Sequence, residues 1–111
     1  MMMLRKRRDA PPPSGGGAAP AERWRFRIYT VGVNPAAETA LRNLRAICSK
    51  HLELEPTIEV VDLEQEPELA LSHGIYAVPT VIRHHPLPLM KVIGDLSDRR
   101  RTLDGLAIGP R

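Results

Sequence analysis

The sequence predicts a small α/β domain with the element order βαβαββα. Two kinds of pattern support this fold class. Four short runs, either alternating polar with apolar residues or rich in Val and Ile, indicate strands. The stretches between and after them carry helix start and stop signals and apolar residues spaced three or four apart. The 111 residues, 42% of them hydrophobic, suffice for one domain with an aliphatic core.

The first strand, helix and second strand form one unit. Residues 25–31 alternate polar and apolar side chains, which is the period of a strand. Asn34 is a favoured N-cap and Pro35 a favoured first helical residue, so a helix of about 17 residues is expected to begin there. Apolar residues then recur along one face of that helix: Leu41, Leu44, Cys48 and Leu52. Residues 57–62 follow as the second strand, and a right-handed parallel unit is expected.

The second half of the chain predicts a short helix, two strands and a last helix. The short helix is expected within residues 64–74, with a glycine as its C-cap. Strands are expected over residues 78–82 and 89–93, joined by a proline-containing turn over residues 84–88. Ser97 is expected to cap the last helix, which weakens toward the glycines near the C-terminus.

The basic charge of the chain lies in its first 24 residues. They hold five basic and two acidic side chains, whereas residues 25–111 hold eleven of each. Residues 1–23 have little to bury and are expected to form a disordered tail ahead of a domain over residues 24–111. The cluster Arg5-Lys6-Arg7-Arg8 is interpreted as an electrostatic handle for an acidic partner, as a solubilising extension, or as the result of a start codon assigned too early. The neutral body argues against nucleic-acid binding.

Membrane insertion, secretion and metal binding are not expected. No apolar run approaches the roughly 20 residues of a membrane-spanning helix, and none follows the basic start, so a soluble cytoplasmic protein is predicted. The single cysteine, Cys48, excludes an internal disulfide and is expected in the core rather than as a reactive thiol. The four histidines, two of them adjacent at His84 and His85, lack the spacing of metal ligands.

The element order resembles thioredoxin topology, but the residues for redox chemistry are missing. Thioredoxin-like oxidoreductases carry Cys-x-x-Cys at the start of the first helix, where this chain reads Asn34-Pro35-Ala36-Ala37. No phosphate-binding glycine loop or nucleophilic serine motif occurs either. No enzymatic activity and no cofactor are therefore expected. Pro79 resembles the cis-proline of such folds, and an ordinary trans proline at a strand entrance is the alternative.

Several segments together resemble the KaiB family. They are Ile28-Tyr29-Thr30-Val31-Gly32, Val60-Val61-Asp62, Ala77-x-Pro79-Thr80 and, most specifically, Ile93-Gly94-Asp95-Leu96-Ser97-Asp98-Arg99. The resemblance runs without a gap from about Trp24 to Arg111. It implies a non-catalytic adaptor that binds the ring of a KaiC-family ATPase and modulates a rhythmic process or timing signal. The family motif here is Gly94, Asp95, Leu96 and Ser97.

The resemblance also implies two folds, a tetrameric ground state and a thioredoxin-like state that binds KaiC. The C-terminal segment Asp104, Gly105, Leu106 and Ala107 belongs to the region that rearranges between them. A charge at Asp104 and a proline at Pro110 disfavour the ground-state strand, and Ala107 favours a helix. We therefore expect a bias toward the thioredoxin-like fold, and a monomer or dimer rather than a tetramer.

Partner contacts are the last expectation from the resemblance. Arg42, Arg83 and Lys91 match positions at which KaiB proteins present basic residues to KaiC, with ordinary surface charge as the alternative. Thr39 and Gly74 are among the positions where a usual basic residue is absent, which favours weaker binding or a different KaiC-like ATPase. The alternative interpretation of the sequence is that the protein is a stand-alone thioredoxin-like module that docks on a histidine kinase or another signalling protein.

Overall fold

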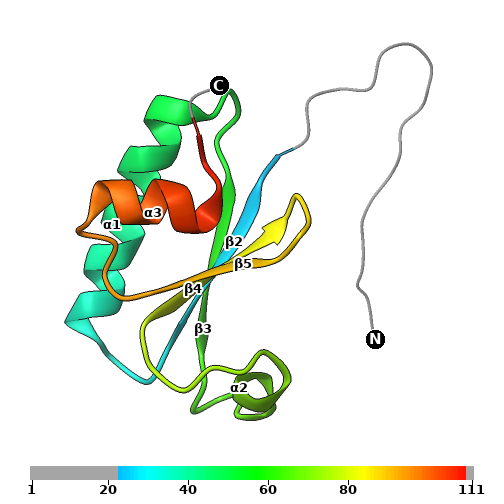
Figure 1. Cartoon of the computed structure of the whole chain (residues 1–111). Coiled ribbons are helices and arrows are strands. Elements are labelled where there is room, and N and C mark those ends of the chain that lie inside the picture. The colour runs from blue at the N-terminus through cyan, green and yellow to red at the C-terminus, as the bar shows by residue number, and fades with distance from the viewer. Residues whose placement is uncertain (1–22, 110–111) are drawn as a thin grey trace.

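The computed structural model describes residues 23–109, which form a mixed four-stranded sheet flanked by helices (Figure 1). The strands are β2 (Arg25–Thr30), β3 (Thr57–Asp62), β4 (Thr80–His85) and β5 (Met90–Ile93), in the sheet order β3-β2-β4-β5. β2 and β3 are parallel, whereas β4 is antiparallel to both β2 and β5. The helices are α1 (Pro35–His51), α2 (Glu68–Ser72) and α3 (Arg99–Leu106). The predicted α/β fold with the order βαβαββα is confirmed.

Helix α1 begins where the sequence predicts it. The side chain of Asn34 accepts hydrogen bonds from the backbone N–H groups of Ala36 and Ala37, at 2.9 and 3.3 Å. These bonds satisfy N–H groups of the first turn, of which that of Ala37 also donates to the carbonyl of Asn34 at 3.0 Å. Pro35 occupies the first turn, where its missing N–H costs nothing.

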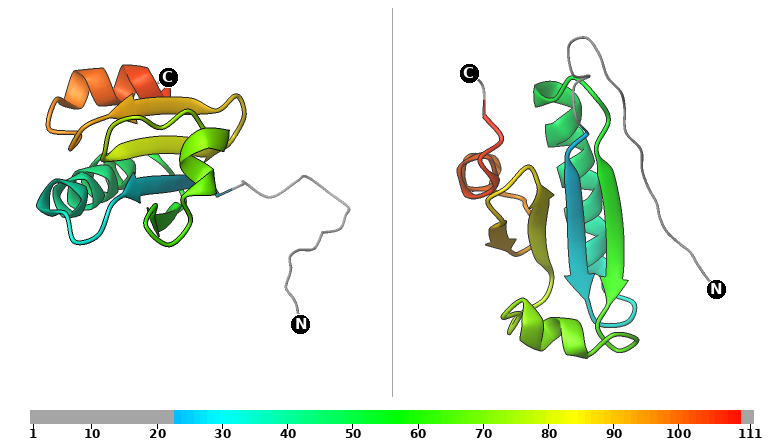
Figure 2. Two further views of the ribbon diagram at one scale, coloured as in Figure 1. Left: turned by 90° about the horizontal axis from the view of Figure 1, so that it is seen from below. Right: turned by 90° about the vertical axis from the view of Figure 1, so that its right-hand side faces the viewer.

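The two faces of the sheet bury different amounts of apolar surface. α1 and α3 cover one face, over a core that includes Phe26, Ile28 and Leu106. The short helix α2 covers one end of the other face, over Tyr29 and Ile82 together with their neighbours. Figure 2 shows α2 at one end of the strands, away from α1 and α3. Full burial of a large apolar side chain stabilises a fold by about 1.5–3 kcal/mol, so the larger core holds the domain together.

Three predicted boundaries differ from the structure. β4 extends through His84 and His85, which were expected in a turn, because this strand pairs with β2 as far as Arg25. α2 is shorter than predicted, since residues 62–66 form a hydrogen-bonded turn ahead of it. The cap of α3 is Asp98 and not Ser97, because the Asp98 carboxylate accepts the N–H of Arg101 at 3.0 Å.

Some expectations concern residues that the structure does not describe. The basic cluster and the rest of residues 1–22 lie outside the described part of the chain, and so does Pro110. Between residues 23 and 109, no helix is long and apolar enough to span a bilayer.

Candidate interaction surface

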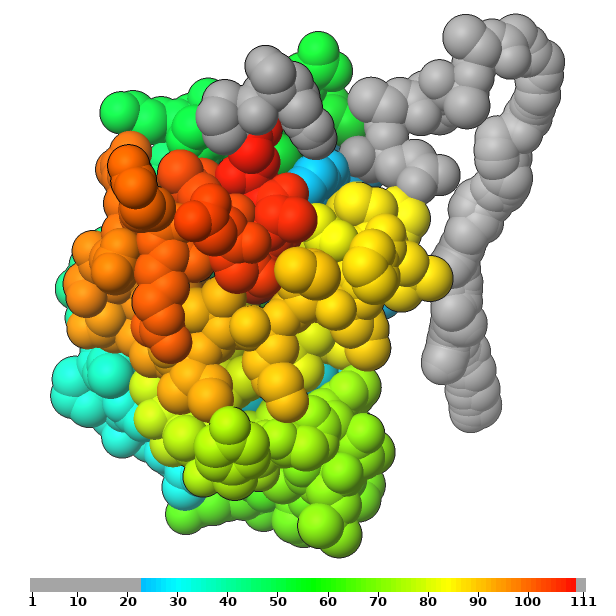
Figure 3. Space-filling view, in the orientation of Figure 1, coloured from blue at the N-terminus to red at the C-terminus, as the bar shows by residue number. Residues whose placement is uncertain are grey.

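One end of the sheet gathers three segments that lie far apart in the sequence. The loop of residues 31–34 follows β2, α2 follows β3, and the loop of residues 73–79 leads into β4. Figures 1 and 3 show this end at the bottom of the molecule. Two hydrogen bonds hold the end of β2 and the loop after it to the end of β3: Gly32 N–H donates to the Asp62 carboxylate at 3.1 Å, and Leu63 N–H donates to the carbonyl of Thr30 at 2.8 Å.

Apolar side chains are exposed on all three of these segments. Val33 is 93% exposed, Leu71 88% and Tyr76 83%, and Val31 and Val78 are partly exposed beside them in sequence. We call these five residues the end surface. Soluble proteins seldom expose many large apolar side chains in one region unless a partner covers them. The end surface is therefore a candidate site for protein binding.

Pro79 lies inside this end of the fold. The Val78–Pro79 peptide bond is cis, and Pro79 itself is buried. Its carbonyl accepts the N–H of Gly94 at 2.8 Å, and the hydroxyl of Thr80 donates to the carbonyl of Ala77 at 2.6 Å. The first bond joins the loop of residues 73–79 to the end of β5, and the second closes the loop on itself where β4 begins. Pro79 thus positions the loop that carries Tyr76.

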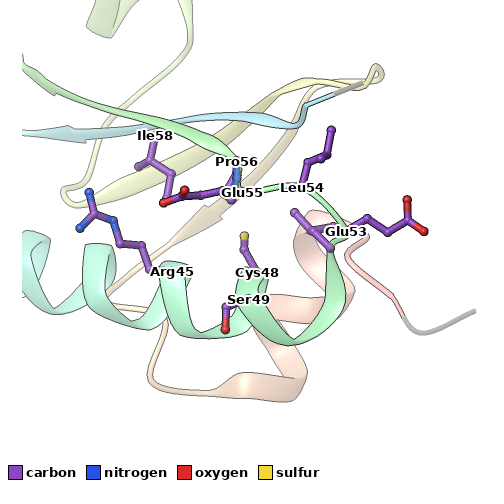
Figure 4. A pocket seen from close by; sticks show the side chains of 9 residues that line it. Arg45, Cys48, Ser49, Glu53, Leu54, Glu55, Pro56 and Ile58 are labelled. Carbon is purple, nitrogen blue, oxygen red and sulfur yellow. The ribbon is translucent and has the colours of Figure 1, made fainter. Parts of the chain in front are cut away.

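Redox enzymes of this topology carry thiols at the start of the first helix. In this chain the start of α1 contains Ala36 and Ala37 instead, and their N–H groups donate to the Asn34 side chain. The thiol of Cys48 lies farther along the helix, only 1% exposed, which confirms it as a core residue. Burial raises the pKa of Cys48 to about 12, so this side chain stays a protonated thiol at neutral pH. It faces a cavity of about 380 Å³ between α1 and the loop before β3 (Figure 4).

The motif Gly94–Ser97 forms the turn that joins β5 to α3. Asp95 accepts the N–H of Ser97 at 3.0 Å, and hydrogen bonds from the Ser97 hydroxyl and N–H hold the pKa of Asp95 below its usual range. The Asn43 side chain donates to the Asp95 carbonyl at 2.9 Å and ties the turn to α1. Leu96 adopts a left-handed conformation, with φ 65°, and is buried in the core. This burial offsets the cost of about 1–2 kcal/mol for that backbone conformation.

The C-terminal segment is helical as far as Leu106. Ala107 then takes a left-handed conformation, with φ 54°, and Ile108 N–H donates to the carbonyl of Leu103 at 2.9 Å. Ala107 therefore ends the helix, whereas the sequence predicted that it would favour one. Leu106 and Ile108 are fully buried. A side chain at Gly105 would clash with Val92, so glycine allows α3 to approach β5 closely.

A comparison with protein families identifies the family of this chain. The model of the KaiB domain matches residues 27–108. The chain belongs to the KaiB family. The circadian clock oscillator protein KaiB of Nostoc punctiforme is 39% identical over 80 residues, which cover 72% of this chain and 77% of that protein. Circadian clock protein KaiB3 of Synechocystis is 33% identical over 84 residues, covering 76% and 82%. The predicted resemblance to KaiB is confirmed.

Solved structures agree on the fold of this KaiB-family chain. The N-terminal domain of Synechococcus elongatus SasA superimposes with a TM-score of 0.67 at 15% identity, covering 90% of this chain and 98% of that one. Mitochondrial thioredoxin 3 of Saccharomyces cerevisiae gives a TM-score of 0.57 at 14% identity, covering 76% of each chain. At these identities the comparison establishes the fold alone, and the thioredoxin-like class is confirmed.

Arg83, an expected partner contact, does not lie on the surface of this KaiB-family chain. It is 4% exposed, and its guanidinium donates to the carbonyls of Leu106 and Pro88, both at 2.9 Å. It also lies over the ring of Trp24, 5.2 Å from the ring centroid. Desolvation lowers the pKa of Arg83. Arg83 thus joins the end of α3 to the β4–β5 hairpin and is corrected from a surface contact to a structural residue.

Arg42 and Lys91 are exposed, but the structure does not bring them together. Arg42 lies on α1 and donates to the hydroxyl of Thr39 at 3.3 Å. Lys91 lies on the opposite face of the sheet, where its ammonium donates to the carbonyls of His73 and Gly74 at 3.2 and 3.3 Å. Only Lys91 therefore contacts a segment of the end surface.

The sequence did not reveal a polar cluster on the α2 side of the sheet. The Tyr29 hydroxyl and His84 Nε2 are 2.9 Å apart, and the His73 ring meets that of His84 edge-on, with centroids 5.3 Å apart. Burial lowers the pKa of His84 to about 4, and the charge of Arg27 adds to this effect. His84 is therefore neutral at pH 7. Within the described residues no three His, Cys, Asp or Glu side chains group as metal ligands would.

Proposed function

We propose that this protein is a non-catalytic KaiB-like adaptor that binds the ring of a KaiC-family ATPase and modulates clock or timing signalling. The end surface carries the proposal. Its apolar side chains occupy the region where redox enzymes of this topology act on their substrates, but the start of α1 supplies no thiol there. Membership of the KaiB family, whose curated relatives are named circadian clock proteins, supports a role in timing.

The chemistry of the end surface fits a protein partner. Leu71 and Tyr76 are almost fully exposed, and burying such side chains is the main source of affinity at interfaces. Lys91 adds one positive charge beside the loop that carries Tyr76. We expect the partner to present an apolar patch with an acidic group at its rim. A rim charge of this kind changes the association rate more than the final affinity.

The first experiment is size-exclusion chromatography with the KaiC-type ATPase of the same organism, in ATP and in ADP. Co-elution with the ATPase ring, stronger in ADP, is the expected result. Leu71→Ala and Tyr76→Ala should weaken binding roughly tenfold or more, as for residues at the centre of an interface. Leu87→Ala is the matched control, because Leu87 is also 73% exposed but lies in the β4–β5 hairpin. Absence of co-elution in both nucleotides would contradict the proposal.

A second candidate is a stand-alone module that docks on a histidine kinase or another signalling protein. The similarity to the N-terminal domain of SasA, 98% of which is covered, favours this alternative at the level of fold. The same chromatography with a histidine kinase of the organism separates the two functions. Binding to the kinase alone, weakened by Tyr76→Ala, would support the second candidate against the first.

A further inference from the structure

A small cavity lies between the start of α1 and the ends of β2 and β3. Its volume is about 160 Å³. Apolar side chains from the loop after β2, from α1 and from β3 form most of its lining: Val33, Ala37, Leu41 and Val60. Figure 1 shows these parts of the chain at the lower end of the molecule, which also carries the end surface.

The hydroxyl of Thr30, which also lines this cavity, has no hydrogen-bond partner among residues 23–109. Thr30 is only 4% exposed, and its Oγ1 is buried. Side chains alternate along β2, so that Phe26 and Ile28 pack beneath α1 and Tyr29 packs on the opposite face. The Thr30 side chain therefore lies on the α1 side of the sheet, as the cavity does. A buried hydroxyl without a partner destabilises a fold, which indicates that the cavity receives a group able to bond to it.

The lining limits the chemistry of that group. An ion between the apolar walls would lose its hydration, and the exposed Glu38 at the rim repels an anion. The N–H groups of Ala36 and Ala37 already donate to the Asn34 side chain, so the start of α1 does not act as an anion site. A neutral group with an acceptor for the Thr30 hydroxyl and a donor for Glu38 fits best. A primary amide has both.

The volume of the cavity limits the length of the group. A water molecule occupies about 30 Å³ in the liquid, so the cavity has room for a group of about five non-hydrogen atoms. A glutamine side chain has this size. Its two methylene groups suit the apolar walls, and its amide suits the hydroxyl of Thr30.

We propose that this cavity binds a primary amide on a short aliphatic stem, the chemistry of a glutamine side chain, presented by the protein partner of the end surface. Val33 belongs both to the end surface and to the wall of the cavity, so one partner covers both. Thr30 is then a residue that determines specificity. That the amide comes from this partner rests on the proposed function, whereas the chemistry of the pocket does not.

Titration with propionamide, a small-molecule analogue of the glutamine side chain, tests the pocket in the full chain by nuclear magnetic resonance. Amide signals of residues 30–41 and of Val60 should shift and saturate, with a Kd that is roughly millimolar for so small a ligand. Propionate has the same shape but an anionic end, and it should leave these signals unchanged at pH 7. Absence of saturation with propionamide would show that the cavity holds only water, and equal shifts with propionate would exclude amide recognition. Either result would overturn the proposal.

Two matched variants test the role of Thr30. Thr30→Val removes the hydroxyl and keeps the shape of the side chain, so it should weaken propionamide binding about fivefold. It should also raise the urea midpoint, because a buried hydroxyl without a partner is removed. Thr102→Val is the control, since Thr102 is 1% exposed but its hydroxyl donates to the carbonyl of Asp98 at 2.8 Å. This variant should lower the urea midpoint and leave the propionamide titration unchanged. A lower midpoint or unchanged propionamide binding in Thr30→Val would overturn the assigned role.

The source of the amide is tested with the KaiC-type ATPase. Thr30→Val should weaken binding to the ATPase by a similar factor of about five, whereas Thr102→Val should not. Equal binding of the ATPase by the wild type and by Thr30→Val would overturn the assignment of the occupant to this partner. Failure of the wild type to bind the ATPase would contradict the proposed function, while saturation with propionamide would still support the pocket.

Discussion

The guanidinium of Arg83 connects the end of α3, the β4–β5 hairpin and Trp24. It donates to the carbonyl of Leu106 at the end of α3 and to that of Pro88 in the hairpin, while its plane covers Trp24. These two hydrogen bonds and the ring contact offset part of the cost of burying the charge, although Nε is buried without a hydrogen-bond partner among the described residues. Arg83 therefore determines where α3 ends on the sheet.

Replacing Arg83 tests this role. Arg83→Met keeps the aliphatic stem but leaves two carbonyls without a donor, so we expect a loss of about 2–4 kcal/mol in the free energy of unfolding. Urea denaturation measures the change. Arg42→Met, on the exposed face of α1, is the control and should change stability by about 0.5 kcal/mol or less. Equal effects of the two substitutions would refute the structural role of Arg83.

Ala107 provides a second test at the scale of the residue. Its left-handed backbone, φ 54°, suits glycine better than alanine. Ala107→Gly should therefore stabilise the domain by about 0.5–1 kcal/mol. Ala46→Gly, at an exposed position within α1, should destabilise it by about 1 kcal/mol. Thermal unfolding of both variants gives the two signs, and a destabilising Ala107→Gly would contradict the assigned end of α3.

At the scale of the element, β4 and α2 are joined by the contact of His84 with Tyr29 and His73. Burial lowers the pKa of His84 to about 4 in the folded state, against an ordinary value of 6.5. The unfolded chain therefore binds more protons than the folded chain between these values. The contribution of neutral His84 to the free energy of unfolding is therefore fully present above about pH 6.5, and it is lost as the pH falls toward 4.

Urea unfolding at pH 7 and at pH 5 measures this dependence. The wild type should lose stability between the two values because His84 must be kept neutral in the fold. His84→Gln retains a hydrogen-bonding group for Tyr29 but does not titrate, so it should reduce the loss. A variant with the same pH dependence as the wild type would exclude His84 as its source.

At the scale of the whole molecule, the last element packs tightly against the sheet. α3 contributes the buried Leu106, its continuation contributes Ile108, and Gly105 allows close packing on β5. Detaching this segment from the sheet would expose two aliphatic side chains and release the Arg83 bridge. The thioredoxin-like state is therefore well stabilised by this sequence.

Chemical shifts and light scattering test that conclusion in solution. We expect helical shifts from residue 99 to residue 106, one set of amide signals, and the mass of a monomer or dimer. Strand-like shifts across residues 100–108, or the mass of a tetramer, would show that the other fold of the KaiB family dominates.

The sequence determined the features that depend on local chemistry. The alternation in β2, the Asn34-Pro35 start of α1 and the βαβαββα order follow from propensities that act within a few residues, and the KaiB motif identified the family.

The site was less predictable. The tertiary structure alone decided that Arg83 is buried while Lys91 stays exposed, and that Val33, Leu71 and Tyr76 are exposed on segments at the same end of the sheet. Burial of a charge depends on strand register and on the element packed above it, and neither can be read from the charge itself.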